Sequence, residues 1–116
     1  MSSQNPSASP TGLSVFIPFA DLIGPGAQSP VTWRQDLEHR FEDALPPGSS
    51  FSGGGTGLDE LDFSFDVPAA QIESACVVAG LFLASAHDVP DTTILEVQLA
   101  SGSRRTIRVG DLRKQR

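Results

Sequence analysis

Strict alternation of apolar and polar side chains between Glu60 and Val67 constrains the fold more than any other feature of the chain. Leu61, Phe63 and Phe65 alternate there with acidic or small polar residues. Because successive side chains of a strand point to opposite faces, one face of this segment belongs in a core and the other in water. A chain of 116 residues is long enough for one domain with a single core.

Shorter periodic segments predict the other elements of the fold. Apolar residues that alternate, or form short apolar runs, predict strands at 13–19, 49–52, 95–99 and 107–109. Apolar residues that recur with helical spacing, or fill a long uncharged segment, predict helices at 32–45 and 68–86. The order strand, helix, strand, strand, helix, strand is the ferredoxin-like βαββαβ pattern. We therefore predict an α+β sandwich, in which an antiparallel sheet has two helices on one face and an extra C-terminal strand.

We expect one ordered domain at residues 13–111. The Ser- and Pro-rich residues 1–12 predict a disordered N-terminal tail, and residues 112–116 predict a basic C-terminal tail. No secretory signal pattern and no apolar stretch of about 18 residues is present, and Cys76 is the single cysteine. A cytoplasmic protein without a membrane segment is therefore expected.

The last two predicted strands form a hairpin. Placing Val97 opposite Ile107 pairs apolar side chains on the core face and sets Glu96 opposite Arg108 on the other face. This register leaves residues 101–103 as the connecting loop.

The first predicted helix carries three informative features. Thr32 and Gln35 have the spacing of a capping box at its start. Trp33 lies in an apolar stripe, which favours a core or rim position, although an aromatic anchor for a partner is the functional alternative. Glu42 and Asp43 lie in the last turn, where negative charge opposes the helix dipole, and this placement hints at a role in binding.

The net charge of −6 is unevenly distributed along the chain. Residues 1–103 contain 13 acids and two arginines, whereas residues 104–116 contain six bases and one acid. An acidic body repels phosphates, so binding of nucleic acid through the main surface is not expected. A basic partner protein is favoured instead.

The glycine run Gly53–Gly57 invites comparison with loops that bind phosphate. Such loops lead directly into a helix whose N-terminus holds the anion. Here a strand follows the run, and neither GxGxxG nor GxxxxGK[ST] is present. A turn or bulge between two strands is the better interpretation, and no cofactor is predicted.

An acidic row, Glu60, Asp62 and Asp66, projects from the polar face of the alternating strand. Neighbouring positions on one face lie about 7 Å apart, so the row could hold a divalent metal or supply carboxylates for acid–base catalysis. A metal site needs more converging ligands, and no nucleophile motif accompanies the row. A solvated sheet face is the plain interpretation, and a partner-docking face is the functional one.

The second predicted helix contains no charged residue from Ser74 to Ala86. A helix that is apolar all round is expected to be covered all round. Small residues such as Ala75 and Gly80 would let another helix approach closely, so a homodimer through this helix is one expectation. Cys76 is interpreted as a small buried apolar residue.

Residues 13–99 resemble small bacterial proteins of ferredoxin-like fold, chiefly through Gly53–Gly57 and the following strand LDELDFSFDV. Some of those proteins resemble immunity proteins, which neutralise a toxin by binding it. The resemblance implies protein binding without catalysis. It assigns no site residues and does not extend to the arginine-rich end.

Three functions are compatible with these features. The first is a non-catalytic protein-binding module, of immunity or antitoxin type, that covers a basic site on a partner. The second is a dimeric regulatory domain that binds a small ligand between subunits, and the third is a metal-assisted enzyme on the carboxylate row. The residues expected to bind the partner are Trp33, Glu42, Asp43, Glu60, Asp62 and Asp66.

Overall fold

The computed structural model describes residues 11–18, 30–56, 60–86 and 88–115. Its elements are β1 (Gly12–Pro18), α1 (Pro30–Ala44), β2 (Ser50–Thr56), β3 (Glu60–Asp66), the 3-10 turn η2 (Ala69–Gln71), α2 (Ile72–Ser85), β4 (Ile94–Gln98), β5 (Arg104–Arg108) and α3 (Val109–Lys114). The predicted tail at 1–12 is wrong at its end, because Thr11 is buried and Gly12 begins β1. The rest of that prediction lies outside the described residues.

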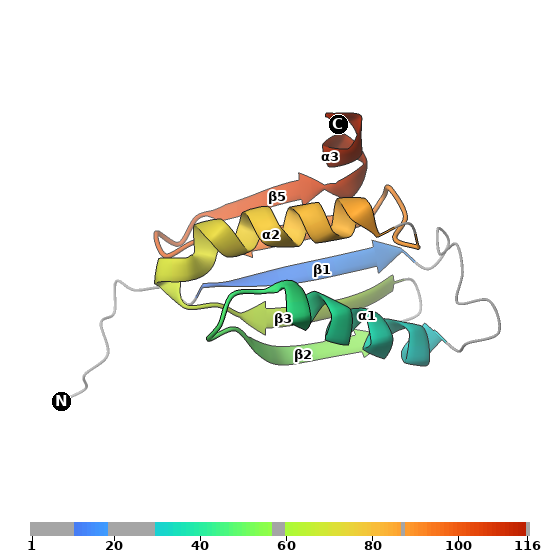
Figure 1. Cartoon of the computed structure of the whole chain (residues 1–116), viewed down its shortest axis with the longest axis horizontal. Helices are drawn as coiled ribbons and strands as arrows, with labels where there is room; N and C mark the ends of the chain where they lie inside the picture. The colour runs from blue at the N-terminus through green and yellow to red at the C-terminus, as the bar shows by residue number, and fades with distance from the viewer. Residues whose placement is uncertain (1–10, 19–29, 57–59, 87, 116) are drawn as a thin grey trace.

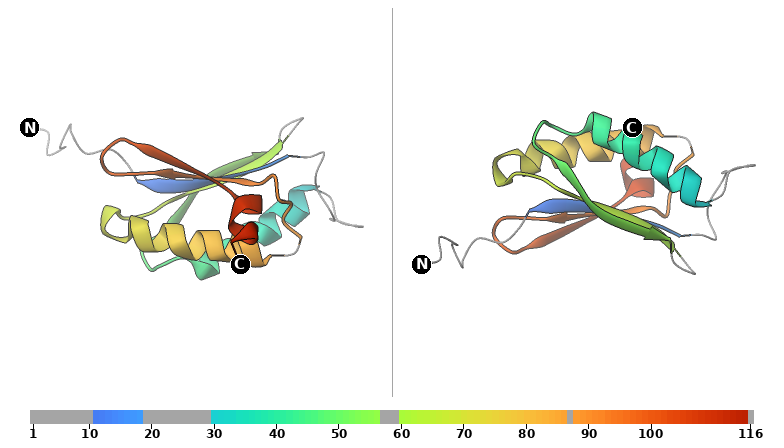
Figure 2. Two further views of the ribbon diagram at one scale, coloured as in Figure 1. Left: turned by 90° about the horizontal axis from the view of Figure 1, so that it is seen from above. Right: turned by 90° about the horizontal axis from the view of Figure 1, so that it is seen from below.

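The five strands form one antiparallel sheet in the order β2-β3-β1-β4-β5. Helices α1 and α2 lie side by side on one face of the sheet, and no helix of the described residues lies on the other face (Figures 1 and 2). This confirms the predicted α+β, ferredoxin-like arrangement, with β5 as the extra strand beside β4. The short helix α3, which follows β5, was not predicted.

The core lies between the sheet and the two long helices. The predicted alternation of β3 is confirmed, since Leu61, Phe63 and Phe65 are buried beneath the helices. Phe41 of α1 packs edge-on against Phe63, with ring centroids 5.3 Å apart, and against Phe82 of α2. Aromatic pairs of this geometry stabilise a core by about 0.5–1.5 kcal/mol beyond the area that they bury.

Both helix starts differ from the sequence-based expectation. Helix α1 begins at Pro30, so Thr32 lies inside the helix and the predicted capping box is wrong. Proline is favoured in the first turn because its missing N–H would have no partner there. The second helix was expected to start near Pro68, but the 3-10 turn η2 precedes it and α2 begins at Ile72.

The predicted register of the last hairpin is wrong by two residues. Leu95, not Val97, lies opposite Ile107, and Glu96 lies opposite Thr106. The observed register places Arg105 on the helix side of the sheet, where its guanidinium contacts the Glu73 carboxylate at 3.2 Å. That hydrogen bond raises the pKa of Arg105. The ion pair with a residue of α2 is a tertiary contact that strand patterns do not encode.

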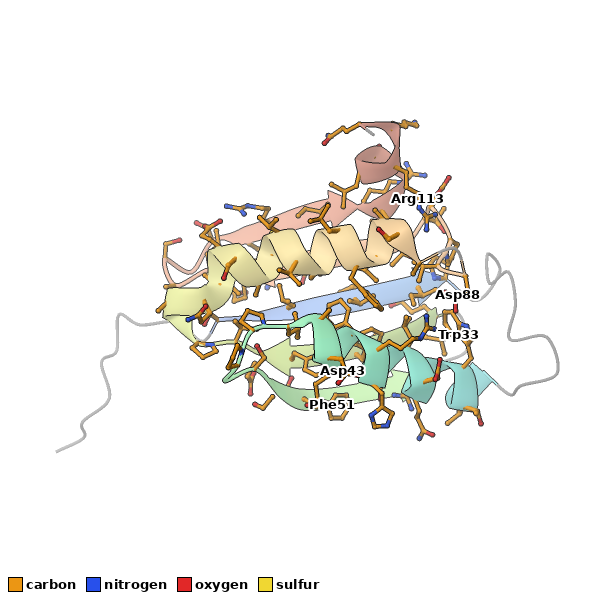
Figure 3. All side chains as sticks on the ribbon, viewed as in Figure 1. Trp33, Asp43, Phe51, Asp88 and Arg113 are labelled. Carbon is orange, nitrogen blue, oxygen red and sulfur yellow. The ribbon has the colours of Figure 1, made fainter. Side chains whose placement is uncertain are left out.

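The predicted basic tail at 112–116 is also wrong, because α3 extends to Lys114. Leu112 covers Gly80 of α2, where a Cβ would lie 3.2 Å from the Leu112 Cδ1. The guanidinium of Arg113 donates to the backbone oxygens of Leu83, Ala84 and Ala86 at 3.3, 3.1 and 2.8 Å (Figure 3). Arg113 therefore caps the C-terminal end of α2, where carbonyls lack partners within the helix.

The glycine run belongs to strand β2 as far as Thr56, with a bulge between Phe51 and Gly53, and Gly57 lies outside the described residues. The ion pair between Arg34 and Glu38 of α1 lies over Gly54. A Cβ at Gly54 would lie 2.7 Å from Arg34 Nη1 and 3.0 Å from the backbone oxygen of Asp62. Glycine is therefore required where α1 closes on the strand, and no anion site is needed to explain it.

We expect Gly54→Ala to lower the free energy of unfolding by about 1–2 kcal/mol, because the new methyl group overlaps the ion pair and the backbone of β3. Gly55→Ala is the matched control, since its Cβ would meet only Asp62 Oδ1, at 3.3 Å. Urea denaturation of the two variants checks the difference. Equal losses would contradict this role for Gly54.

Candidate interaction surface

Strand β2 forms one edge of the sheet, and among the described residues it pairs only with β3. From Ser50 to Thr56 it contains no charged residue and no proline. The opposite edge, β5, carries three arginines. Charged side chains are a common protection of edge strands against pairing with other chains. The two edges of this sheet are therefore chemically different, and β2 is the unprotected one.

A hollow of about 440 Å³ lies between α1 and β2. It is lined by Gln35, Glu38, His39, Glu42, Phe51 and Phe65. Phe51 is 47% exposed and rests edge-on against Phe65, with ring centroids 5.5 Å apart (Figure 3). An apolar ring beside carboxylates is a suitable contact for a side chain with both apolar and cationic parts. The sequence pattern places Phe51 in the short strand predicted at 49–52 but does not identify it as a site residue.

The acidic row of β3 projects from the face of the sheet that carries no helix. Asp62 lies opposite Gly55 and Asp66 lies opposite Ser50 of β2. Since the β2 residues there have small side chains or none, Asp62 and Asp66 stand close behind the open edge, and Glu60 lies one residue beyond the last β2–β3 pair, Thr56 with Leu61. The row predicted from sequence thus borders the same edge strand as the hollow, from the other side of the sheet.

Glu42 and Asp43, which were predicted together as partner-binding residues, lie on different sides of α1. Glu42 lines the hollow beside β2, whereas Asp43 is exposed and does not line it. Successive residues of a helix are rotated by about 100°, which separates their side chains. Only Glu42 shares a surface with the edge strand.

Trp33 is 2% exposed, so its core interpretation is the correct one and its ring offers no accessible anchor. Its indole N–H donates to Asp88 Oδ2 at 3.1 Å, and Arg40 donates to the same oxygen at 2.9 Å (Figure 3). Burial by itself would raise the pKa of Asp88, but the hydrogen bond and charge of Arg40 outweigh it, and the pKa is lowered. This cluster joins α1 to the segment after α2.

The open face of the sheet carries basic residues as well as the acidic row. Arg104 and Arg108 of β5 project from the same face as the acidic row, at the far edge of the sheet. Arg104 lies 3.7 Å from Glu96 of β4. The acidic surface is therefore confined to the β2 side.

Arginine partners divide the acidic residues into two groups. Each member of the first group forms an ion pair: Asp36, Glu38, Glu73, Asp88, Asp91 and Glu96. Among the described residues the second group forms none: Glu42, Asp43, Glu60, Asp62, Asp66 and Asp111. Four of these six surround β2, and we call Glu42, Glu60, Asp62 and Asp66 the β2 carboxylates. Uncompensated negative charge is thus concentrated around the open edge.

Helix α2 is covered on one side only. Val77 and Leu81 are 61% and 60% exposed, contrary to the expectation of a helix covered all round. A largely apolar groove of about 360 Å³ runs beside them, between α2, α3 and Ile107 of β5. Cys76 at its wall is buried, as the sequence predicts.

Within the described residues, no three His, Cys, Asp or Glu side chains gather closely enough to hold a metal ion. In the same part of the chain, no helix has the length and apolar character needed to cross a membrane. Comparison of the chain with protein-family models, curated proteins and solved structures gave no match. Its function has to be inferred from its own residues.

Proposed function

We propose that this chain is a non-catalytic protein-binding module, of immunity or antitoxin type, that covers a basic site on a partner protein. The observation that carries the proposal is the concentration of unpaired carboxylates around one open strand edge. Within the described part of the chain, six other acids form ion pairs with arginines, whereas Glu42, Glu60, Asp62 and Asp66 form none. A cytoplasmic location belongs to the same proposal.

The physical basis is electrostatic complementarity. A surface of one charge sign accelerates encounter with a partner of the opposite sign and disfavours partners of like sign. Nucleic acid is repelled by such a surface, whereas a cluster of lysines or arginines on a protein is attracted. The exposed ring of Phe51 adds apolar contact area next to the charges, and aromatic residues are enriched in binding hot spots.

The proposal is tested with the double variant Glu60→Lys, Asp66→Lys. Both side chains are exposed, so the fold should tolerate the change. We expect capture of the partner from cells of the natural source to be abolished, as measured by affinity purification and mass spectrometry.

The matched control is Asp43→Lys, Asp111→Lys, which changes the net charge equally at two exposed sites away from β2. It should capture the same partner as the unmodified chain. Equal capture by both double variants would refute the assignment of the binding surface to the β2 side.

A second candidate is a dimeric regulatory domain that binds a small ligand between subunits. It is favoured by the exposed Val77 and Leu81 beside the apolar groove, since large exposed apolar patches mark association sites. We expect Val77→Lys, Leu81→Lys to convert such a dimer to a monomer in sedimentation equilibrium. A strictly monomeric mass of the unmodified chain at high concentration would exclude this candidate.

A further inference from the structure

We infer that the partner binds by adding an extended basic segment to the outer edge of β2, as one further antiparallel or parallel strand of the sheet. This inference rests on the proposed function, because it names the chemistry of the partner and the way in which the acidic surface receives it. Strand addition at a free sheet edge is a recurrent mode of peptide recognition, in which main-chain hydrogen bonds provide affinity and side-chain contacts provide specificity.

The edge itself supports strand addition. Natural sheets protect their edges with charged residues, proline, bulges or covering elements. At β5 three arginines fill this role, whereas the bulge between Phe51 and Gly53 is the only such feature of β2 in the ranges that the structure describes. From Gly53 to Thr56 the strand pairs with β3 without a further irregularity. This stretch is therefore the part of the edge best suited to pair with another strand.

The surroundings of the edge select a basic segment. Side chains of an added strand would point alternately to the two faces of the sheet. On the helix face they would reach the hollow that contains Glu42 and Phe51. On the opposite face they would approach Asp62 and Asp66. Carboxylates on both faces favour a segment that carries lysine or arginine, with an apolar side chain for the exposed Phe51 ring.

A second copy of this chain is a poorer occupant, although its β5 strand is also basic. Two of the β5 arginines are already engaged, Arg104 by Glu96 and Arg105 by Glu73. Pairing of β5 with β2 of the next copy would also be head-to-tail, which produces a ring or an open fibre of many copies instead of a simple pair. The open edge therefore fits a different protein better than it fits this one.

The inference is tested with a synthetic peptide of roughly seven alternating lysine and valine residues, about the length of one strand. Two further peptides carry N-methyl groups on alternate residues, one on the odd and one on the even positions. Each keeps the charge and side chains but loses the hydrogen-bond donors of one edge. Binding to the full chain is measured by nuclear magnetic resonance, through amide shifts and hydrogen exchange.

We expect the unmodified peptide to slow hydrogen exchange of β2 amides by about tenfold or more, because paired backbone amides are protected. We also expect one methylated peptide to lose binding while the other keeps it. Equal binding of both methylated peptides at the β2 carboxylates would overturn strand addition but leave the proposed function intact. Protection of β5, or assembly of the chain into larger species, would also overturn it. If no basic peptide bound and the Glu60→Lys, Asp66→Lys variant still captured its partner, the proposed function itself would fail.

Discussion

Replacing Arg113 by alanine should lower the free energy of unfolding by about 2–4 kcal/mol. The Arg113 guanidinium donates to three backbone oxygens at the end of α2 and forms an ion pair with Asp91 (Figure 3). Hydrogen bonds to charged groups contribute about 1.5–3 kcal/mol each, and the partly exposed setting reduces their sum. The positive charge also interacts favourably with the negative, C-terminal end of the helix dipole. Removal should release α3 from α2.

Chemical denaturation checks this value against two other variants. Lys114→Ala changes the next residue, which is exposed, and should cost less than about 0.5 kcal/mol. Arg113→Lys should be intermediate, because an ammonium group lacks the planar fork that reaches several carbonyls at once. If Arg113→Ala and Lys114→Ala had the same small effect, the contact between α3 and α2 would not be a significant source of stability.

The elements that could be predicted from sequence are those whose pattern is local. Alternation from Glu60 to Asp66 predicts β3 and its buried face, and helical spacing predicts α1 and α2. The order of these elements is sufficient for the ferredoxin-like arrangement, because short connections and antiparallel pairing leave few alternatives. The acidic row of β3 could also be assigned to the open face of the sheet.

What the sequence did not reveal depends on tertiary contacts. The arginine-rich end resembles a solvated tail until Arg113 is placed beside the last carbonyls of α2. Pairing Glu96 with Arg108 made the predicted hairpin register look consistent. The observed register instead places Arg105 where it forms an ion pair with Glu73 of α2. The glycine run could not be assigned to a strand from its sequence. Glycine is needed at position 54 because an ion pair of α1 lies over it, and this contact is tertiary. Phe51 was not recognised as a site residue and β2 was not recognised as an open edge, because side-chain exposure and strand order are also set by tertiary contacts.

The second large effect concerns two neighbouring acids on α1. Glu42→Lys should weaken binding of the lysine–valine peptide by about tenfold or more, which corresponds to about 1.4 kcal/mol. The new charge would lie in the hollow beside Phe51, where the basic segment is expected. Asp43→Lys makes the same change in net charge on another side of the helix. Since α1 is about 10 Å thick and charges are screened over about 8 Å at physiological salt, its effect should stay within about twofold.

The affinity ratio of these two variants is the most direct test of the binding surface. Calorimetric titration of Glu42→Lys and Asp43→Lys with the same peptide, at the same ionic strength, compares two proteins of equal charge. The location of the surface on the β2 side predicts that Glu42→Lys binds at least about fivefold more weakly than Asp43→Lys. Equal affinities would show that the peptide senses only the net charge of the chain, and the assignment of a binding surface around β2 would be wrong.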